Sequence, residues 1–253
     1  MIDHQIPKII HYCWFGGKPH PELIQECISS WRKYCPDYEI IQWDETNFDI
    51  SSNQFVAEAY AAGKWAFVSD YVRLYALFHY GGIYLDTDVE LFKPLDCFLS
   101  NSAFTGFEAH DSPVTAIMGC AKGYTLFGEM LEYYQNRSFF KDGEMDLLPN
   151  TYIITDYLVK RGIILNGKQQ TISGCTVYPE IVFCPNNILR LFNKYSRKTY
   201  CVHHFVGSWG ANPVTAKRTF PQRMRMYLVH ISRNFIGTER LYKLGQIIKH
   251  EKQ

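Results

Sequence analysis

The first half of the chain alternates between short apolar runs and segments with helical spacing. Residues 6–14 are almost continuously apolar and stop at Phe15-Gly16-Gly17, which predicts a buried strand followed by a loop. Pro21 and apolar positions three or four residues apart up to Trp31 predict a helix, and residues 38–43 predict a second strand. This strand–helix–strand order is typical of a Rossmann-like layer.

A second helix is predicted over residues 69–80, directly before a short strand at 83–85. Ser69 suits the N-cap position, and the two glycines after the helix suit its end. Asp86 and Asp88 then follow the strand. Both carboxylates are therefore expected at a carboxyl end of the sheet, where ligands of open α/β folds gather.

The rest of the chain carries weaker signals. Strands are predicted at 103–107, 114–120, 176–183 and 199–205, and helices at 48–62, 124–135 and 151–161. Residues 212–253 have apolar positions at helical spacing and predict one or two amphipathic helices. We therefore expect a catalytic domain over residues 1–211 and a basic helical tail over residues 212–253.

Charge is divided between these two parts. The 253 residues have a formal net charge of +1, but residues 1–211 hold 17 Lys and Arg against 23 Asp and Glu, whereas residues 212–253 hold 9 against 2. The balanced total argues against a nucleic-acid-binding protein. The tail is expected either to lie on an anionic membrane surface or to pack as an ordinary solvated helix.

Cysteine spacing and hydropathy indicate the compartment. The eight cysteines include no C-x-x-C pair, which favours reduced and mostly buried thiols over a metal site or a disulfide framework. No apolar run approaches the roughly 20 residues that span a bilayer. A cytoplasmic protein is therefore expected.

Two pairs of charged residues are the candidates for chemistry. Asp86 and Asp88 are two positions apart in an extended segment, so both side chains can point to one place, where a divalent ion such as Mg²⁺ or Mn²⁺ would relieve their repulsion. The alternative is a turn with two solvated acids. Asp70 and Arg73 share one helix face, either as a structural ion pair or as part of the same site.

The run Ala66-Phe-Val-Ser-Asp-Tyr-Val-Arg-Leu-Tyr-Ala-Leu-Phe-His-Tyr-Gly-Gly-Ile-Tyr-Leu-Asp-Thr-Asp88 resembles the D-x-D sugar-binding region of glycosyltransferase family 32, and also the catalytic domains of large clostridial glucosylating toxins. Residues 9–19 are similar to the family's opening strand, and 203–209 to its closing H-x-x-x-S-W element. The resemblance implies an α/β GT-A glycosyltransferase fold, a single Rossmann-like domain with a mixed central sheet.

The resemblance also implies roles for individual residues. A Mn²⁺ or Mg²⁺ ion would be held by Asp88, with Asp86 orienting the metal or the ribose and His204 completing the shell. His204 is preferred to the adjacent His203 because of its spacing to Gly207, although neighbours in a strand face opposite ways. The expected contacts to the donor are base stacking by Trp14, sugar binding by Ser69, Asp70 and Arg73, and phosphate binding by Ser208 and Trp209. Asp70, Arg73 and Asp88 would lie nearest the reaction.

The function implied is a metal-dependent retaining hexosyltransferase. Its donor would be a nucleotide sugar, with UDP-hexose favoured and GDP-mannose the alternative, and its acceptor a glycan or lipid-linked glycan in bacterial capsule or lipopolysaccharide synthesis. Retention would use either a covalent intermediate or front-face attack. Two alternatives stay open, a toxin-like transferase that glycosylates a protein and a non-catalytic nucleotide-sugar-binding protein.

Overall fold

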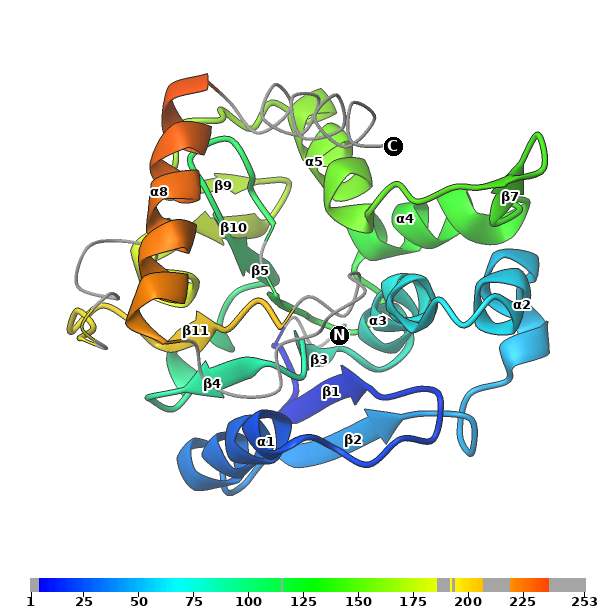
Figure 1. The fold of residues 1–253 in the computed structure, drawn as a ribbon, viewed down its shortest axis with the longest axis horizontal. Helices are drawn as coiled ribbons and strands as arrows, with labels where there is room; N and C mark the ends of the chain where they lie inside the picture. Colours follow the sequence, from blue (N-terminus) through cyan, green and yellow to red (C-terminus); the bar gives the residue numbers. More distant parts are fainter. Residues whose placement is uncertain (1–4, 115, 186–191, 193, 207–218, 237–253) are drawn as a thin grey trace.

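A mixed seven-stranded sheet forms the centre of the protein (Figure 1). The computed structural model describes residues 5–114, 116–185, 192, 194–206 and 219–236. Within the sheet, β6 runs antiparallel to both of its neighbours, β3 and β5, while β1 is parallel to β2 and β3. In spatial order the strands are β2 (Glu39–Trp43), β1 (Ile9–Cys13), β3 (Gly82–Leu85), β6 (Ile117–Cys120), β5 (Ala103–Gly106), β10 (Cys175–Tyr178) and β9 (Gln170–Ile172).

The predicted strand–helix–strand unit is confirmed. Helix α1 (Glu22–Tyr34) begins after Pro21 and connects β1 to the parallel strand β2. Its buried side chains are those of the predicted apolar face, Leu23, Ile24, Cys27, Ile28 and Trp31. The α/β class, with one Rossmann-like mixed sheet, is therefore confirmed.

Helix α3 (Trp65–Tyr80) begins four residues before the predicted position. The prediction that Ser69 caps this helix is wrong, since the Ser69 hydroxyl donates to the Trp65 carbonyl 3.0 Å away, inside the helix. Phe67 and Val68 are buried, so packing extends the helix beyond the point where the cap signal placed its start. Asp70 consequently lies in the second turn, away from the free amides of the N-terminus.

The segment before α3 and the central region largely follow the predictions. The predicted helical stretch at 48–62 is a short 3₁₀ helix, η1 (Ile50–Ser52), followed by α2 (Gln54–Ala61). Helices α4 (Thr125–Gln135) and α5 (Asn150–Lys160) lie where they were expected. A hairpin of β7 (Phe140–Lys141) and β8 (Glu144–Met145) between them was not predicted, nor was η2 (Asp96–Phe98).

The predicted strand at 176–183 is wrong in its second half. Strand β10 ends at Tyr178, and α6 (Glu180–Phe183) follows Pro179. Proline has no N–H for a strand ladder and its fixed φ suits a helix start, which explains the change. A separate two-stranded sheet pairs β4 (Val89–Leu91) with β11 (Cys201–His203), shorter than the strand predicted at 199–205.

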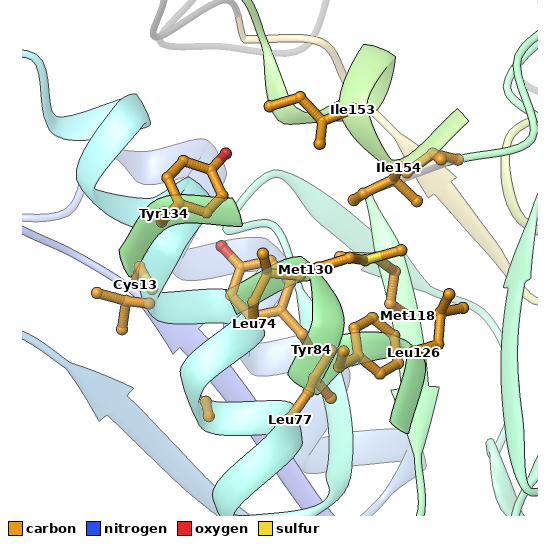
Figure 2. Packing of buried hydrophobic residues seen from close by; sticks show 14 of the residues in the cluster. Cys13, Leu74, Leu77, Tyr84, Met118, Leu126, Met130, Tyr134, Ile153 and Ile154 are labelled. Carbon is orange, nitrogen blue, oxygen red and sulfur yellow. The ribbon is translucent and has the colours of Figure 1, made fainter. Parts of the chain in front are cut away.

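The hydrophobic core lies on both faces of the central sheet. Tyr84 of β3 belongs to one cluster, whereas its neighbours Ile83 and Leu85 belong to the other. Figure 2 shows part of the first cluster, where Leu77 of α3 and Met130 of α4 pack near Tyr84. The sheet is thus covered on both sides, which fixes the strand ends at which the charged residues lie. Seven of the eight cysteines are buried in the structure, and Cys97 is exposed.

The predicted basic tail is described only in part. Helix α8 spans Phe220–Ile236 and contacts α6 where His230 Nε2 lies 3.3 Å from Glu180 Oε2 (Figure 1). Residues 212–218 and 237–253 lie outside the described residues. Among the described helices, none has both the length and the hydropathy to cross a membrane. The domain boundary at residue 211 stays a prediction.

Candidate active site

The D-x-D motif lies in a tight turn at the carboxyl end of β3. Two glycines with positive φ, Gly81 and Gly82, turn the chain from α3 into this strand, and a Cβ on Gly82 would lie 2.7 Å from the carbonyl oxygen of Ile9. The Asp86 amide donates to the Ala116 carbonyl, and the Val89 amide donates to the Asp86 carbonyl. These bonds hold both carboxylates at the strand end, as the sequence predicts.

Arg73 joins the helix to the D-x-D turn. One of its terminal nitrogens lies 3.4 Å from Asp70 Oδ1 and 3.1 Å from Asp86 Oδ1, and its Nε donates to the Ser69 carbonyl. The guanidinium also lies over the Tyr84 ring, 4.7 Å from its centre. Because the Arg73 side chain is only 7% exposed, it is held as a fixed positive charge between two carboxylates.

Asp70 is the most deeply buried acid of the site, with 1% of its side chain exposed. Burial raises the pKa of its carboxyl to about 7, against the lowering effects of Arg73 and of a hydrogen bond from the Asn150 amide. The Asn150 side chain also donates to the Asp70 backbone carbonyl, 3.2 Å away. Among the described residues, Asp70 Oδ1 has no hydrogen-bond partner besides its ion pair with Arg73.

Asp88 is bound by the segment that follows β11. Its Oδ2 lies 3.2 Å from His203 Nε2 and accepts a 2.7 Å hydrogen bond from the Val206 amide. Burial acts to raise the pKa of Asp88, but His203 and the Val206 amide outweigh it and lower the pKa to about 2. Asp88 is therefore ionised at neutral pH.

Asp86, Asp88 and His203 form the metal-compatible group of the described residues. One ligand atom from each lies within 4.8 Å of the others. Burial raises the pKa of Asp86, partly offset by Arg73 and His203. Two carboxylate oxygens and one imidazole nitrogen are a donor set that suits a first-row divalent ion, Mn²⁺ better than Mg²⁺ because of the nitrogen.

The structure places His203, rather than His204, with the two aspartates. His204 Nε2 lies 2.9 Å from Glu90 Oε2, and only its backbone amide approaches Asp88, donating to the Asp88 carbonyl. Adjacent side chains at a strand end point in opposite directions, so one histidine reaches Asp88 while the other reaches Glu90. This arrangement favours His203 as the ligand, whereas the spacing to Gly207 favoured His204, and the metal ligand itself stays a prediction.

Of the four other predicted donor contacts, the structure describes two, Trp14 and Ser69. Trp14 follows β1, is half-buried, and donates from Nε1 to the Lys18 carbonyl while its ring meets His20 edge-on. The half-buried Ser69 lies one turn before Arg73 on α3. Ser208 and Trp209 lie outside the described residues, so their phosphate-binding role stays a prediction.

Three residues of the site had no role in the sequence-based prediction. Tyr84, Glu90 and Val206 contact Arg73, His204 and Asp88, respectively. Glu90 had a signal, because it continues the i, i+2 spacing of Asp86 and Asp88 in the sequence. The Val206 contact uses a backbone amide, which no residue pattern reveals.

The mixed α/β fold thus places this acid–arginine–histidine cluster at a strand end. Residues 21–105 match the family described as the glycosyltransferase sugar-binding region containing the DXD motif. This match covers the D-x-D turn, α3 and α1, and it confirms the resemblance found in the sequence.

Curated relatives come from two yeasts. The chain is 33% identical over 131 residues to inositol phosphoceramide mannosyltransferase 3 of Schizosaccharomyces pombe, covering 47% of this chain and 34% of the relative. It is 30% identical over 138 residues to mannosyl phosphorylinositol ceramide synthase SUR1 of Saccharomyces cerevisiae, covering 50% and 34%. The chain spans about a third of the length of these curated relatives.

The solved structures that are similar to this chain include two glycosyltransferases. The PaToxG glycosyltransferase gives a TM-score of 0.46 at 19% identity over 62% of this chain and 70% of that one. The galactosyltransferase LgtC, in complex with donor and acceptor sugar analogs, gives 0.41 at 12% identity over 87% and 95%.

Proposed function

We propose that this protein is a metal-dependent retaining glycosyltransferase that moves a hexose from a nucleotide sugar to a glycan or lipid-linked glycan. The observation that carries the proposal is the cluster of Asp86, Asp88 and His203 beside the buried Asp70–Arg73 pair. All of these residues except His203 lie within the family match. A nucleotide-sugar donor needs both halves of this site, one for the diphosphate and one for the sugar.

The diphosphate half is the carboxylate–histidine group. Asp86, Asp88 and His203 would hold Mn²⁺ or Mg²⁺, which supplies charge neutralisation for the departing diphosphate. Asp88 suits this role because its lowered pKa keeps it ionised, and the Val206 amide fixes its orientation. Asp86 pairs with Arg73 and also belongs to the carboxylate–histidine group, so it can orient the donor through Arg73 or through the metal.

The sugar half is the Asp70–Arg73 pair. Asp70 Oδ1 is buried and accepts no hydrogen bond from the described residues, and Arg73 holds fixed N–H groups beside it. A polar pair held this way selects ligands that complete its hydrogen bonds. Trp14 would provide the base platform, with its indole N–H already fixed on Lys18.

Donor and acceptor remain part of the proposal. The sequence favours a UDP-hexose, whereas the yeast relatives are named for mannose transfer to inositol phosphoceramide, which favours GDP-mannose and a lipid-linked acceptor. Retention of configuration would use a covalent intermediate or front-face attack. The anomeric configuration of the first product formed distinguishes retention from inversion. The bacterial surface-polysaccharide setting and the cytoplasmic location stay predictions.

The proposal is tested by slow hydrolysis of UDP-glucose, UDP-galactose and GDP-mannose with Mn²⁺ and with EDTA. At least one donor should be hydrolysed only with the metal, and Asp88→Asn should reduce that rate by about 100-fold or more, because it removes one of the two carboxylates that would hold the metal. Asp142→Asn is the matched control: it makes the same chemical change at an exposed hairpin residue. The proposal would be contradicted if Asp88→Asn kept full activity, or if the wild type hydrolysed none of the three donors.

A further inference from the structure

Four large apolar side chains are exposed within nine consecutive residues between α4 and α5. Phe140, Met145, Leu147 and Leu148 are 42%, 41%, 48% and 44% exposed, and we call this group the apolar strip. Single exposed apolar residues are ordinary, but a group of them marks a binding surface. A smaller group, Val159, Ile164 and Leu165, lies at the far end of α5.

The strip is exposed although its backbone is anchored. Arg137 pairs with Asp146, the Asp146 amide donates to the Phe139 carbonyl at 2.8 Å, and the Phe139 amide donates to Glu58 at 2.7 Å. Phe139 itself is fully buried. The hairpin therefore presents its apolar side chains from a fixed base, a geometry that lowers the ordering cost of binding.

The strip lies next in the chain to a residue that contacts the candidate active site. Only Pro149 separates Leu148 from Asn150, whose amide and side chain donate to Asp70. Figure 1 shows the chain passing from the β7 hairpin along α4 to the start of α5. The smaller group lies at the other end of this 11-residue helix, roughly 16 Å away.

The charge of the segment that carries the strip distinguishes between two candidate ligands, an uncharged lipid chain and an anionic membrane surface. Between Phe140 and Leu148 the segment holds Lys141 against Asp142, Glu144 and Asp146. This negative balance opposes an anionic leaflet, which attracts basic segments. It does not oppose an uncharged hydrocarbon chain.

We propose that the apolar strip binds the lipid chain of a lipid-linked acceptor while its glycan extends toward the donor sugar at Asp70 and Arg73. The inference rests on the proposed function for the glycan end, and on the strip alone for the lipid end. The strip variant that tests it is Leu147→Gln with Leu148→Gln, and the matched control is Val159→Gln with Ile164→Gln. Both replace two exposed apolar side chains by amides of similar length.

The probe is dodecyl β-maltoside below its micelle concentration, titrated calorimetrically against the full chain, with maltose as reference. The wild type should bind the dodecyl compound at least about tenfold more tightly than maltose, because several methylenes leave water. The strip variant should lose that advantage and the control variant should keep it. Equal binding of the two probes by the wild type, or equal losses in both variants, would overturn the proposal.

Donor hydrolysis by the same variants separates this inference from the proposed function. It should be unchanged in the strip variant, because Leu147 and Leu148 are exposed and belong neither to the carboxylate–histidine group nor to the Asp70–Arg73 pair. Dodecyl binding that depends on the strip, in a protein that hydrolyses no donor, would reject the transferase and leave a lipid-binding surface. A concentration-dependent dimer that the strip variant abolishes would assign the strip to a second copy of this chain and overturn the lipid proposal.

Discussion

Arg73 determines the electrostatics of the candidate site. It is the basic group between the buried carboxylate of Asp70 and the half-buried carboxylate of Asp86, and it stacks on Tyr84. Both acids have raised pKa values because of burial, and Arg73 opposes that rise in each. Removing one partner of a buried charged group costs about 3–5 kcal/mol, because the other charge stays buried. Arg73 therefore maintains the fold and the site together.

The two adjacent histidines give the sharpest residue-scale prediction. His203→Gln should raise the Mn²⁺ concentration needed for half-maximal donor hydrolysis by about 100-fold, because the cluster with Asp86 and Asp88 loses a ligand. His204→Gln should change it little, because that imidazole binds Glu90.

A titration of activity against Mn²⁺ checks this ranking, with circular dichroism to confirm that both variants fold. The metal dependence is a better readout than the maximal rate, because a general loss of structure would lower the rate in either variant. A larger shift for His204→Gln than for His203→Gln would restore the ligand preferred from the sequence.

At the scale of elements, His11 joins three segments of the sheet region. From β1, its Nδ1 accepts a hydrogen bond from Trp43 Nε1 of β2, and its Nε2 donates to the Gly81 carbonyl between α3 and β3. These partners require a neutral imidazole with the proton on Nε2. Burial lowers the pKa of His11 to about 4, although the Gly81 bond acts to raise it.

His11 should make the fold sensitive to acid. Its folded-state pKa of about 4 lies below the unfolded value near 6.5, so its contribution to stability is complete above pH 6.5 and is lost as the pH falls toward 4. The loss should approach about 3 kcal/mol. Urea unfolding of the wild type and of His11→Gln between pH 7.5 and 4 measures it. The variant should have the flatter profile, and parallel profiles would contradict this role.

At the scale of the whole molecule, the charge is divided between an acidic body and a basic tail. The body contains the carboxylates of the candidate metal group. Helix α8 makes up almost all of the part of the tail that the structure describes. Arg225, Leu228 and Val229 are all exposed on α8, a mixture that suits either water or a lipid headgroup region. We propose that the tail provides peripheral contact with anionic membranes.

A charge-matched pair of variants tests the tail. The tail variant carries Arg240→Gln, Lys243→Gln, Lys249→Gln and Lys252→Gln. It should bind vesicles with anionic lipid about tenfold or more weakly at low salt, because each basic residue near a membrane surface contributes to the electrostatic attraction. The control variant replaces four exposed lysines of the body and should weaken vesicle binding less. Its substitutions are Lys122→Gln, Lys141→Gln, Lys160→Gln and Lys168→Gln. Equal losses in a sedimentation assay would mean that only total charge matters.

The sequence by itself determined the order of elements around the D-x-D motif. Strand β1, helix α1, strand β2 and the Asp86-Thr87-Asp88 turn follow from apolar spacing, a proline and two glycines. These signals are local, since each depends on residues a few positions apart. The start of α3 was misplaced because buried contacts of Phe67 and Val68 override a capping signal at Ser69.

Only the tertiary structure decided which side chains meet. Asn150 reaches Asp70 across 80 positions, and His203 rather than His204 reaches Asp88. The distances between such residues depend on how helices and strands pack, and a shift of one residue at the end of β11 would exchange the two histidines. Local sequence sets the elements, whereas packing sets the site, because the free energy of burying the core fixes the strand ends against one another.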